Sequence, residues 1–149
     1  MSDILKDPEI MRQIIMDHYQ YPHHHHLKEG DDVLSKHMSS ASCIDDITVQ
    51  LVLADDVISE VRFDGVGCAI STASTSIMTE LLTGKTVDQA KDIIAQFFAM
   101  VDERDYDEEK LEEAVVFCNV SKQAARIKCA TIGWQAVTEM LEEADEKGK

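Results

Sequence analysis

The apolar residues of one segment of this chain differ in spacing from those of the rest, and that segment limits the folds open to the chain. Between 46 and 53 they alternate along the chain, with the period of two that is typical of a β-strand. One face carries Ile47, Val49, Leu51 and Leu53. A short turn at 54–56 leads into a second stretch of strand type, 57–63. Together the two stretches predict an antiparallel hairpin.

Outside the hairpin the spacing is helical. Asp7 followed by Pro8 is typical of a helix start, and this first helix is predicted to end at Tyr21-Pro22. Residues 22–42 show no clear period and are expected to be irregular. Four later helices are predicted: from 69 to a stop at Gly84, from a capping box at Thr86 to about 101, over 108–117, and from about 127 or 131 to 143. This order predicts an α+β fold in a single domain, 1–149, because strands and helices do not alternate.

The charge of the chain narrows the classes of partner. The 149 residues suffice for one domain with its own core, and 29 acidic residues against 14 basic ones give a net charge of −15. Such a surface repels phosphate backbones and anionic lipids, so we expect neither nucleic acid nor a membrane as a partner. A basic protein or metal cations fit the charge, and so does a role in solubility alone.

The sequence shows no export or membrane signal. No apolar run approaches the ~20 residues of a membrane span, and no basic segment followed by an apolar one opens the chain. We therefore expect no signal peptide and a cytoplasmic location. In that reducing compartment the four cysteines are expected to be thiols or metal ligands rather than disulfides.

Three cysteines and one acid lie at the edges of the predicted elements. Cys43 and Asp45 precede the first strand, and residues two apart in an extended segment point to the same side. Cys68 follows the second strand, so the hairpin returns it to the same end of the sheet. Cys129 lies near the start of the last helix, and no pattern in the sequence brings it to the other three.

These residue types are compatible with metal chemistry, although their spacing alone is a weak signal. Three thiolates and one carboxylate make a reasonable tetrahedral zinc site, or an anchor for an iron–sulfur cluster. The segment Gly65-Val66-Gly67 before Cys68 predicts a tight bend and a close approach of the backbone. Because the chain has no CxxC pair, a second interpretation stays open, in which the three cysteines are small buried apolar residues.

Two further features have no assigned role. The histidine run, residues 23–26, is predicted to be a solvated loop, because adjacent residues do not easily converge on one ion; metal binding is the alternative. Cys118 is predicted to be a core residue, because Val115 and Phe117 beside it are apolar and fit a helix.

The chain also resembles a known family, the SufU branch of the IscU-like iron–sulfur cluster assembly proteins, which are related to the NifU N-terminal domain. The resemblance extends from the first predicted helix to the end of the last. It rests on Asp17-His18-Tyr19 with Pro22, on GVGCAISTAS at 65–74, and on RIKCAT at 126–131 with Trp134.

This resemblance implies about three antiparallel strands packed against several helices. It implies that Cys43, Asp45, Cys68 and Cys129 bind a zinc ion, or that the three cysteines anchor a [2Fe–2S] cluster. It also implies that Cys43 accepts persulfide sulfur from a SufS-like cysteine desulfurase, and that downstream Fe–S acceptor proteins follow. Such a protein is a scaffold or sulfur acceptor, at most a zinc-dependent sulfurtransferase. Lys128, where the IscU branch has a histidine, is typical of the SufU branch.

The first ligand motif departs from the family pattern. The family's PxCGD reads Ala41-Ser42-Cys43-Ile44-Asp45 in this chain, without the proline and the glycine. If the family glycine has a positive φ, the β-branched Ile44 is strained in its place. This difference motivates an alternative function, a divergent paralogue that binds or regulates the desulfurase without transferring sulfur.

Overall fold

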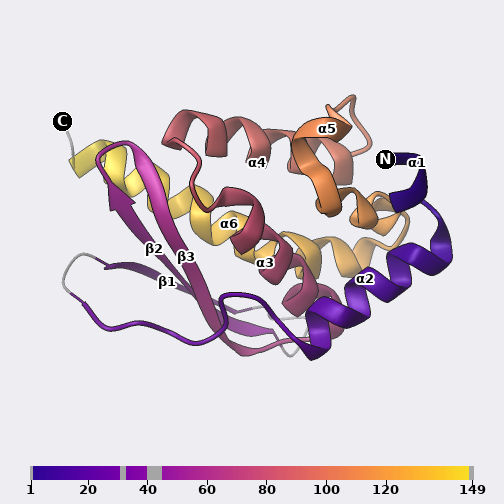
Figure 1. The fold of residues 1–149 in the computed structure, drawn as a ribbon, viewed down its shortest axis with the longest axis horizontal. Coiled ribbons are helices and arrows are strands. Elements are labelled where there is room, and N and C mark those ends of the chain that lie inside the picture. Colours follow the sequence, from indigo (N-terminus) through magenta and orange to yellow (C-terminus); the bar gives the residue numbers. More distant parts are fainter. Residues whose placement is uncertain (1, 31–32, 40–44, 148–149) are drawn as a thin grey trace.

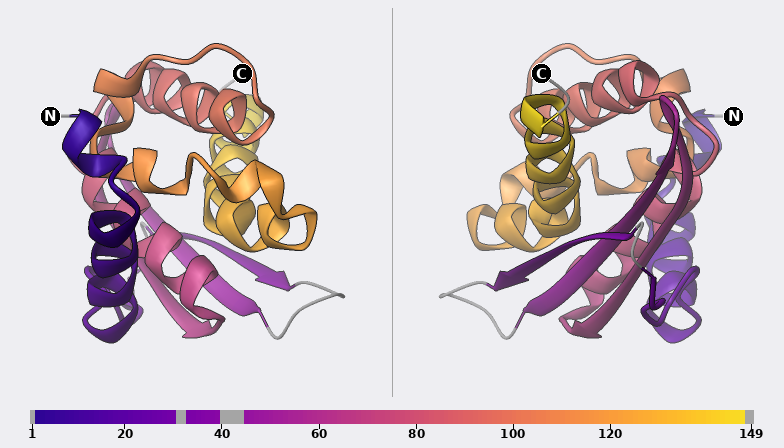
Figure 2. Two further views of the ribbon diagram at one scale, coloured as in Figure 1. Left: turned by 90° about the vertical axis from the view of Figure 1, so that its right-hand side faces the viewer. Right: turned by 90° about the vertical axis from the view of Figure 1, so that its left-hand side faces the viewer.

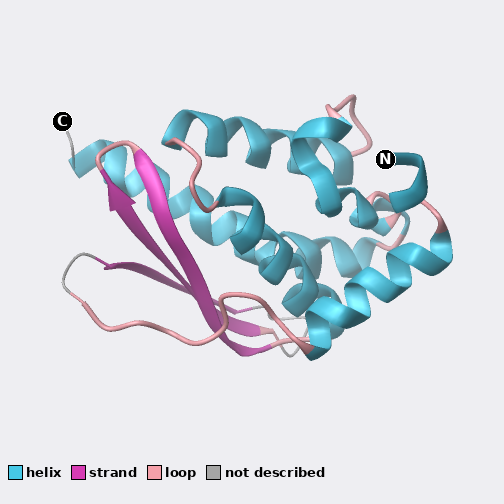
Figure 3. Ribbon diagram, in the orientation of Figure 1, coloured by secondary structure: helices cyan, strands magenta, loops and turns pink. Residues whose placement is uncertain are grey.

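A three-stranded antiparallel sheet carries the helices of the protein on one side (Figure 1). The structure, a computed structural model, describes residues 2–30, 33–39 and 45–147. Its strands are β1 (Val33–Ser39), β2 (Asp46–Ala54) and β3 (Val57–Val66), with β2 in the centre. Figure 3 shows the strands gathered at one side of the molecule and the helices at the other.

Six helices and two 3-10 turns, joined by loops, make up the rest of the described chain. They are α1 (Ser2–Leu5), α2 (Pro8–Gln20), α3 (Ala69–Leu82), α4 (Val87–Val101), α5 (Glu108–Leu111), η1 (Glu112–Phe117), η2 (Val120–Lys122) and α6 (Ala124–Lys147). Helices α3 and α6 pack against each other and against the sheet, α2 packs on α3, and α4 packs on α6 (Figure 2). The expected α+β fold with three antiparallel strands is confirmed. Within the described residues, no helix is both long and apolar enough to span a bilayer.

The hairpin forms where the alternation predicts it. Val49 pairs with Phe63 and Leu51 pairs with Val61, and all four side chains are buried beneath the helices. Their burial provides most of the sheet's contribution to the core. The strand β3 continues three residues beyond its predicted end, to Val66.

The strand β1 contradicts the prediction that residues 22–42 are irregular. Its inward positions carry Leu34, Lys36 and Met38, of which only the first and last pack on the core. Lys36 Nζ lies 2.8 Å from Glu143 Oε1 on α6, so an ion pair replaces an apolar contact at the middle position. A short edge strand with a charge on its inner face lacks the alternation that identifies a strand.

The predicted helix starts are confirmed where a capping residue is present. Asp7 caps α2, and Thr86 and Gln89 form the capping box of α4. The helix predicted over 108–117 is wrong in part, because Glu112 has φ +47° and divides the segment into α5 and the 3-10 turn η1. The last helix begins earlier than predicted, at Ala124.

A buried polar seam joins α3 to α6. Ser74 Oγ on α3 donates to the carbonyl of Ala130 at 2.6 Å and accepts from Trp134 Nε1 at 2.9 Å. The Trp134 ring also stacks on Phe97, with centroids 4.0 Å apart. These contacts fix the rotation of α6 about its own axis, and Cys129 is adjacent to one of the bonded residues.

Candidate metal centre

Three of the four predicted ligands come together in the structure. The ligand atoms of Asp45, Cys68 and Cys129 all lie within 4.8 Å of one another. Asp45 directly precedes β2, Cys68 is the N-cap residue of α3, and Cys129 lies in the second turn of α6. Cys43 and Ile44 lie outside the described residues. Below, Asp45, Cys68 and Cys129 are called the cysteine cluster.

Asp45 is held in the cluster by the N-terminus of α3. Its side chain is buried, and its Oδ1 accepts hydrogen bonds from the Cys68 backbone N–H at 2.9 Å and from Ser71 Oγ at 2.8 Å. Backbone N–H groups at a helix N-terminus favour a negative charge there. The carboxylate is therefore oriented before any ion binds.

Ser71 is a positioning residue that the sequence did not single out. It is buried, and besides its bond to Asp45 its backbone N–H donates to Cys68 Sγ at 3.5 Å. The available signal was its spacing, because a side chain three residues after an N-cap residue faces back toward it, as in a capping box.

Cys68 is the more accessible of the two described thiols in the cluster. Burial raises the pKa of its thiol, but hydrogen bonds from Ser71 and from Cys129 together lower the pKa by more, so it falls below its ordinary value. A lowered pKa favours the thiolate, which is the form that binds metal and attacks sulfur.

Cys129 approaches the cluster from within the core. Its side chain is 1% exposed, and its Sγ lies 3.9 Å from the Ala125 carbonyl, one turn earlier in α6. Lys128, its neighbour, is exposed to solvent. Cys129 converges on the other ligands because the seam between α3 and α6 sets the direction in which it points.

A close backbone approach brings the two ends of the hairpin together. Gly65 on β3 lies opposite Ile47 on β2 and has φ +129°. A Cβ atom at Gly65 would lie 2.1 Å from the carbonyl oxygen of Asp46, closer than any real contact. The predicted close approach is confirmed, and it explains why Cys68 returns to the side of Asp45.

The donor set fits a thiophilic cation. Two thiolates and one carboxylate suit zinc, and cysteines also anchor iron–sulfur clusters. Burying several anionic ligands together is costly unless a cation compensates them. The cluster of buried Asp45 and Cys129 with half-buried Cys68 therefore offers such a cation three ligand atoms.

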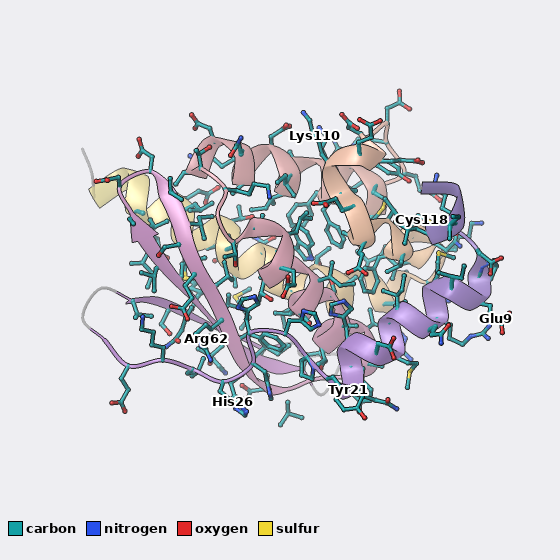
Figure 4. The ribbon with its side chains drawn as sticks, viewed as in Figure 1. Glu9, Tyr21, His26, Arg62, Lys110 and Cys118 are labelled. Atoms are coloured by element: carbon teal, nitrogen blue, oxygen red, sulfur yellow. The ribbon has the colours of Figure 1, made fainter. Side chains whose placement is uncertain are left out.

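The other features noted in the sequence lie apart from this cluster. Cys118 is only half-buried at the side of the core, so the prediction of a core residue is confirmed in part. Figure 4 shows Cys118 near α1 and His26 near the sheet, on opposite sides of the molecule. The histidine run has contacts of its own, which are described below.

Comparison with known proteins agrees with the geometry. Residues 10–130 match the NifU-like N terminal domain family. The zinc-dependent sulfurtransferase SufU of Bacillus subtilis is 36% identical over 129 residues, which cover 86% of each chain. The iron–sulfur cluster assembly scaffold protein IscU of Streptococcus pyogenes is 34% identical, over 86% of this chain and 80% of that protein.

Solved structures of similar sequence share the fold of this chain. A candidate iron–sulfur cluster assembly scaffold protein for the SUF system from Fervidobacterium islandicum superposes with a TM-score of 0.77 at 30% identity, over 87% of this chain and 94% of that one. A crystal structure of a hypothetical protein gives a TM-score of 0.82 at 32% identity, over 90% and 98%. The fold, the motif spacing and the matched residues together establish that this chain belongs to the NifU-like N-terminal domain family.

Proposed function

We propose that this protein works in iron–sulfur cluster assembly, as a sulfur acceptor that receives persulfide sulfur from a cysteine desulfurase. The observation that carries the proposal is the convergence of Asp45, Cys68 and Cys129 from three separate elements. Relatives named for zinc-dependent sulfur transfer and for cluster scaffolding cover most of the chain, which supports the same assignment.

Zinc is the ion that we propose for the site, with Cys43 as the fourth ligand beside Asp45, Cys68 and Cys129. A bound zinc ion keeps its cysteine ligands in the thiolate form at neutral pH. A [2Fe–2S] cluster on the three cysteines is the other cofactor that this donor set accepts. The carboxylate among sulfur ligands favours exchange, which suits a protein that passes sulfur onward.

Cys43 is the proposed acceptor. Its thiolate attacks the terminal sulfur of the desulfurase persulfide, and the bond between that sulfur and the desulfurase cysteine breaks. The desulfurase cysteine leaves as a thiolate, and the proton stays on the transferred sulfur, so that Cys43 now carries the persulfide. Asp45, held by Ser71 and the Cys68 N–H, stays in place during this exchange.

The first experiment is to measure metal and acid-labile sulfide in untagged protein purified without oxygen. One zinc ion per chain without sulfide supports the sulfur acceptor. Iron with matching sulfide supports the scaffold. Folded protein that binds neither metal contradicts both forms of the proposal.

The second experiment tests Cys43 directly. Adding the protein to a cysteine desulfurase should raise its turnover, and Cys43→Ala should abolish the rise. Cys118→Ala is the matched control, because Cys118 lies outside the cysteine cluster and should leave the rise intact. Full stimulation by Cys43→Ala would show that the relay runs through another residue.

A second candidate function rests on Ile44. If the family needs glycine there, this chain binds the desulfurase without accepting sulfur, and it acts as a regulator. The test is Ile44→Gly. Stimulation gained by this variant favours the regulator, whereas unchanged behaviour shows that Ile44 does not limit the reaction.

A further inference from the structure

The histidine run is a fixed part of the sheet edge. His26 N–H donates to the Phe63 carbonyl at 2.8 Å, and Phe63 N–H donates to the His24 carbonyl at 3.1 Å, so the run bonds to the free edge of β3. The Arg62 guanidinium reinforces the run by donating to the His26 carbonyl at 2.8 Å. The expectation of a loop is met, but the backbone of this loop is anchored.

The run divides into two pairs that face different carboxylates. His23 and His24 both contact Glu80 Oε1, at 2.7 and 3.1 Å. His25 Nε2 lies 3.2 Å from Asp64 Oδ1, and His26 Nδ1 lies 3.6 Å from Asp64 Oδ2. Within the second pair His26 has φ +90°, and the two rings lie side by side with centroids 4.4 Å apart.

The donor geometry of the second pair matches a metal site. Two donors about 2.0 Å from a tetrahedral ion lie about 3.3 Å from each other, and the two rings lie at similar distances from the Asp64 carboxylate, one beside each oxygen. All three donor atoms lie within 4.8 Å of one another. The groups of described residues whose donor atoms all lie within 4.8 Å of one another do not include His23, His24 and Glu80.

We propose that His25, His26 and Asp64 form a second metal site, which binds Zn²⁺ or a similar divalent transition ion. Imidazole nitrogen with one carboxylate oxygen is a donor set for zinc, copper and nickel rather than for magnesium or calcium. Three protein ligands leave one position for water, so the ion exchanges with solvent. Below, these three residues are called the histidine cluster.

The surroundings are compatible with a bound cation. The charge of Arg62 is paired with Glu60 at 2.9 Å, and Glu60 also pairs with Lys28 at 3.2 Å. His25 packs on the Phe63 ring with centroids 5.2 Å apart, which limits its rotation. The net charge of −15 attracts cations to the whole surface.

The test is a titration of the full-length protein, purified without oxygen and stripped of metal, with Co²⁺ and then with Zn²⁺. Cobalt bound to thiolate gives an intense charge-transfer band, whereas cobalt bound to imidazole and carboxylate gives none. We expect two ions per chain in the unaltered protein, of which one gives the band. Cys68→Ser/Cys129→Ser should lose the ion that gives the band and keep the other.

Matched variants locate the second ion. His26→Asn should weaken its binding by about 100-fold or more, since loss of even a second-shell partner costs 10- to 100-fold. His24→Asn is the control, because both histidines have a positive φ, which asparagine tolerates. Asp64→Asn, which keeps an oxygen for the Gly65 N–H, should match His26→Asn.

Each outcome decides the proposal. A single ion per chain that gives the charge-transfer band, or a second ion that is lost with His24→Asn and kept with His26→Asn, overturns it. A second ion lost only with the histidine-cluster variants supports it. If the cysteine cluster binds no metal, a single ion without the charge-transfer band still supports the histidine cluster, so the two proposals fail separately.

Discussion

The cysteine cluster and the histidine cluster are both close to the end of β3 and are built in opposite ways. The first takes its ligands from three elements that are far apart in sequence, and two of its three members are buried. The second takes two adjacent histidines and one strand residue, and their side chains are 30%, 74% and 41% exposed. Burial and sequence separation tie the first cluster to the folded state, whereas the second can be altered without disturbing the core.

This difference has a thermodynamic consequence. An ion stabilises a protein only to the extent that it binds the folded state better than the unfolded chain. The unfolded chain cannot bring Asp45, Cys68 and Cys129 together without closing long loops. The histidine cluster, in contrast, joins two adjacent residues to Asp64 and so closes only one such loop, and any binding of zinc to the histidines of the unfolded chain reduces its effect on stability further.

The largest effect is therefore expected on zinc-dependent stability. Zinc at about 1,000 times its Kd should stabilise the protein by about 4 kcal/mol through the cysteine cluster. Cys129→Ser should remove most of that gain, while His26→Asn should change it by about 1 kcal/mol or less. Urea unfolding of each variant with and without zinc measures the gain directly, since any loss of basal stability cancels within one variant. An undiminished gain in Cys129→Ser would remove this cysteine from the metal site.

The second effect concerns the backbone that supports the cysteine cluster. Gly65→Ala places a Cβ against the Asp46 carbonyl at a positive φ, so it should destabilise the fold by about 3 kcal/mol or more. Gly84→Ala is the matched control, because Gly84 also has a positive φ but has no atom within 4 Å of the added Cβ. It should cost about 1 kcal/mol.

Chemical denaturation of the two glycine variants checks this prediction. Gly65→Ala should also weaken zinc binding at the cysteine cluster, while Gly84→Ala should not. Equal losses of stability in both variants would show that the close approach of β2 and β3 does not support the site.

The contrast also explains how far the sequence could predict the site. Asp45 and Cys68 were expected at one end of the sheet, because an antiparallel hairpin brings its two outer ends together. Cys129 depends on the polar seam of Ser74 with Ala130 and Trp134, and no local pattern encodes contacts between distant helices. Its place in the cluster followed only from the resemblance to the family.

The errors in the fold have equally local causes. The sequence does not predict β1, because Lys36 interrupts the apolar face of this strand. It does not predict the break at Glu112 either, because a positive φ at a non-glycine residue leaves no sequence signal. Convergence of the histidine run on one ion was expected to be difficult, because its residues are adjacent in the chain. In the structure His26 has a positive φ, and its ring lies beside that of His25.

A smaller effect is expected from Ser71→Ala. This change removes one of the hydrogen bonds to buried Asp45 Oδ1, so it should cost about 1–3 kcal/mol and weaken zinc binding at the cysteine cluster by about 10- to 100-fold. Ser59→Ala is the control: its exposed hydroxyl donates to the Val52 carbonyl, and its loss should cost under about 0.5 kcal/mol. Zinc affinity unchanged in Ser71→Ala would contradict the role of Ser71 in positioning Asp45.

The smallest effect concerns Glu80, whose carboxylate contacts His23 and His24. A hydrogen bond from the His23 ring lowers the pKa of Glu80 below its ordinary value, against a smaller opposing effect of burial. A carboxylate with a lowered folded-state pKa adds stability above its unfolded pKa, and that stability is lost as the pH falls below about 4.3. Glu80→Gln should therefore flatten the acid side of the stability curve by well under 1 kcal/mol, since Glu80 is about half exposed. Unfolding between pH 3 and 6, with Glu142→Gln as the exposed control, measures this change.

Metal binding by His25 and His26 should persist in Glu80→Gln, because the hydrogen bonds between the histidine run and β3 do not involve Glu80. Loss of metal binding in this variant would mean that the two histidine pairs act as one unit.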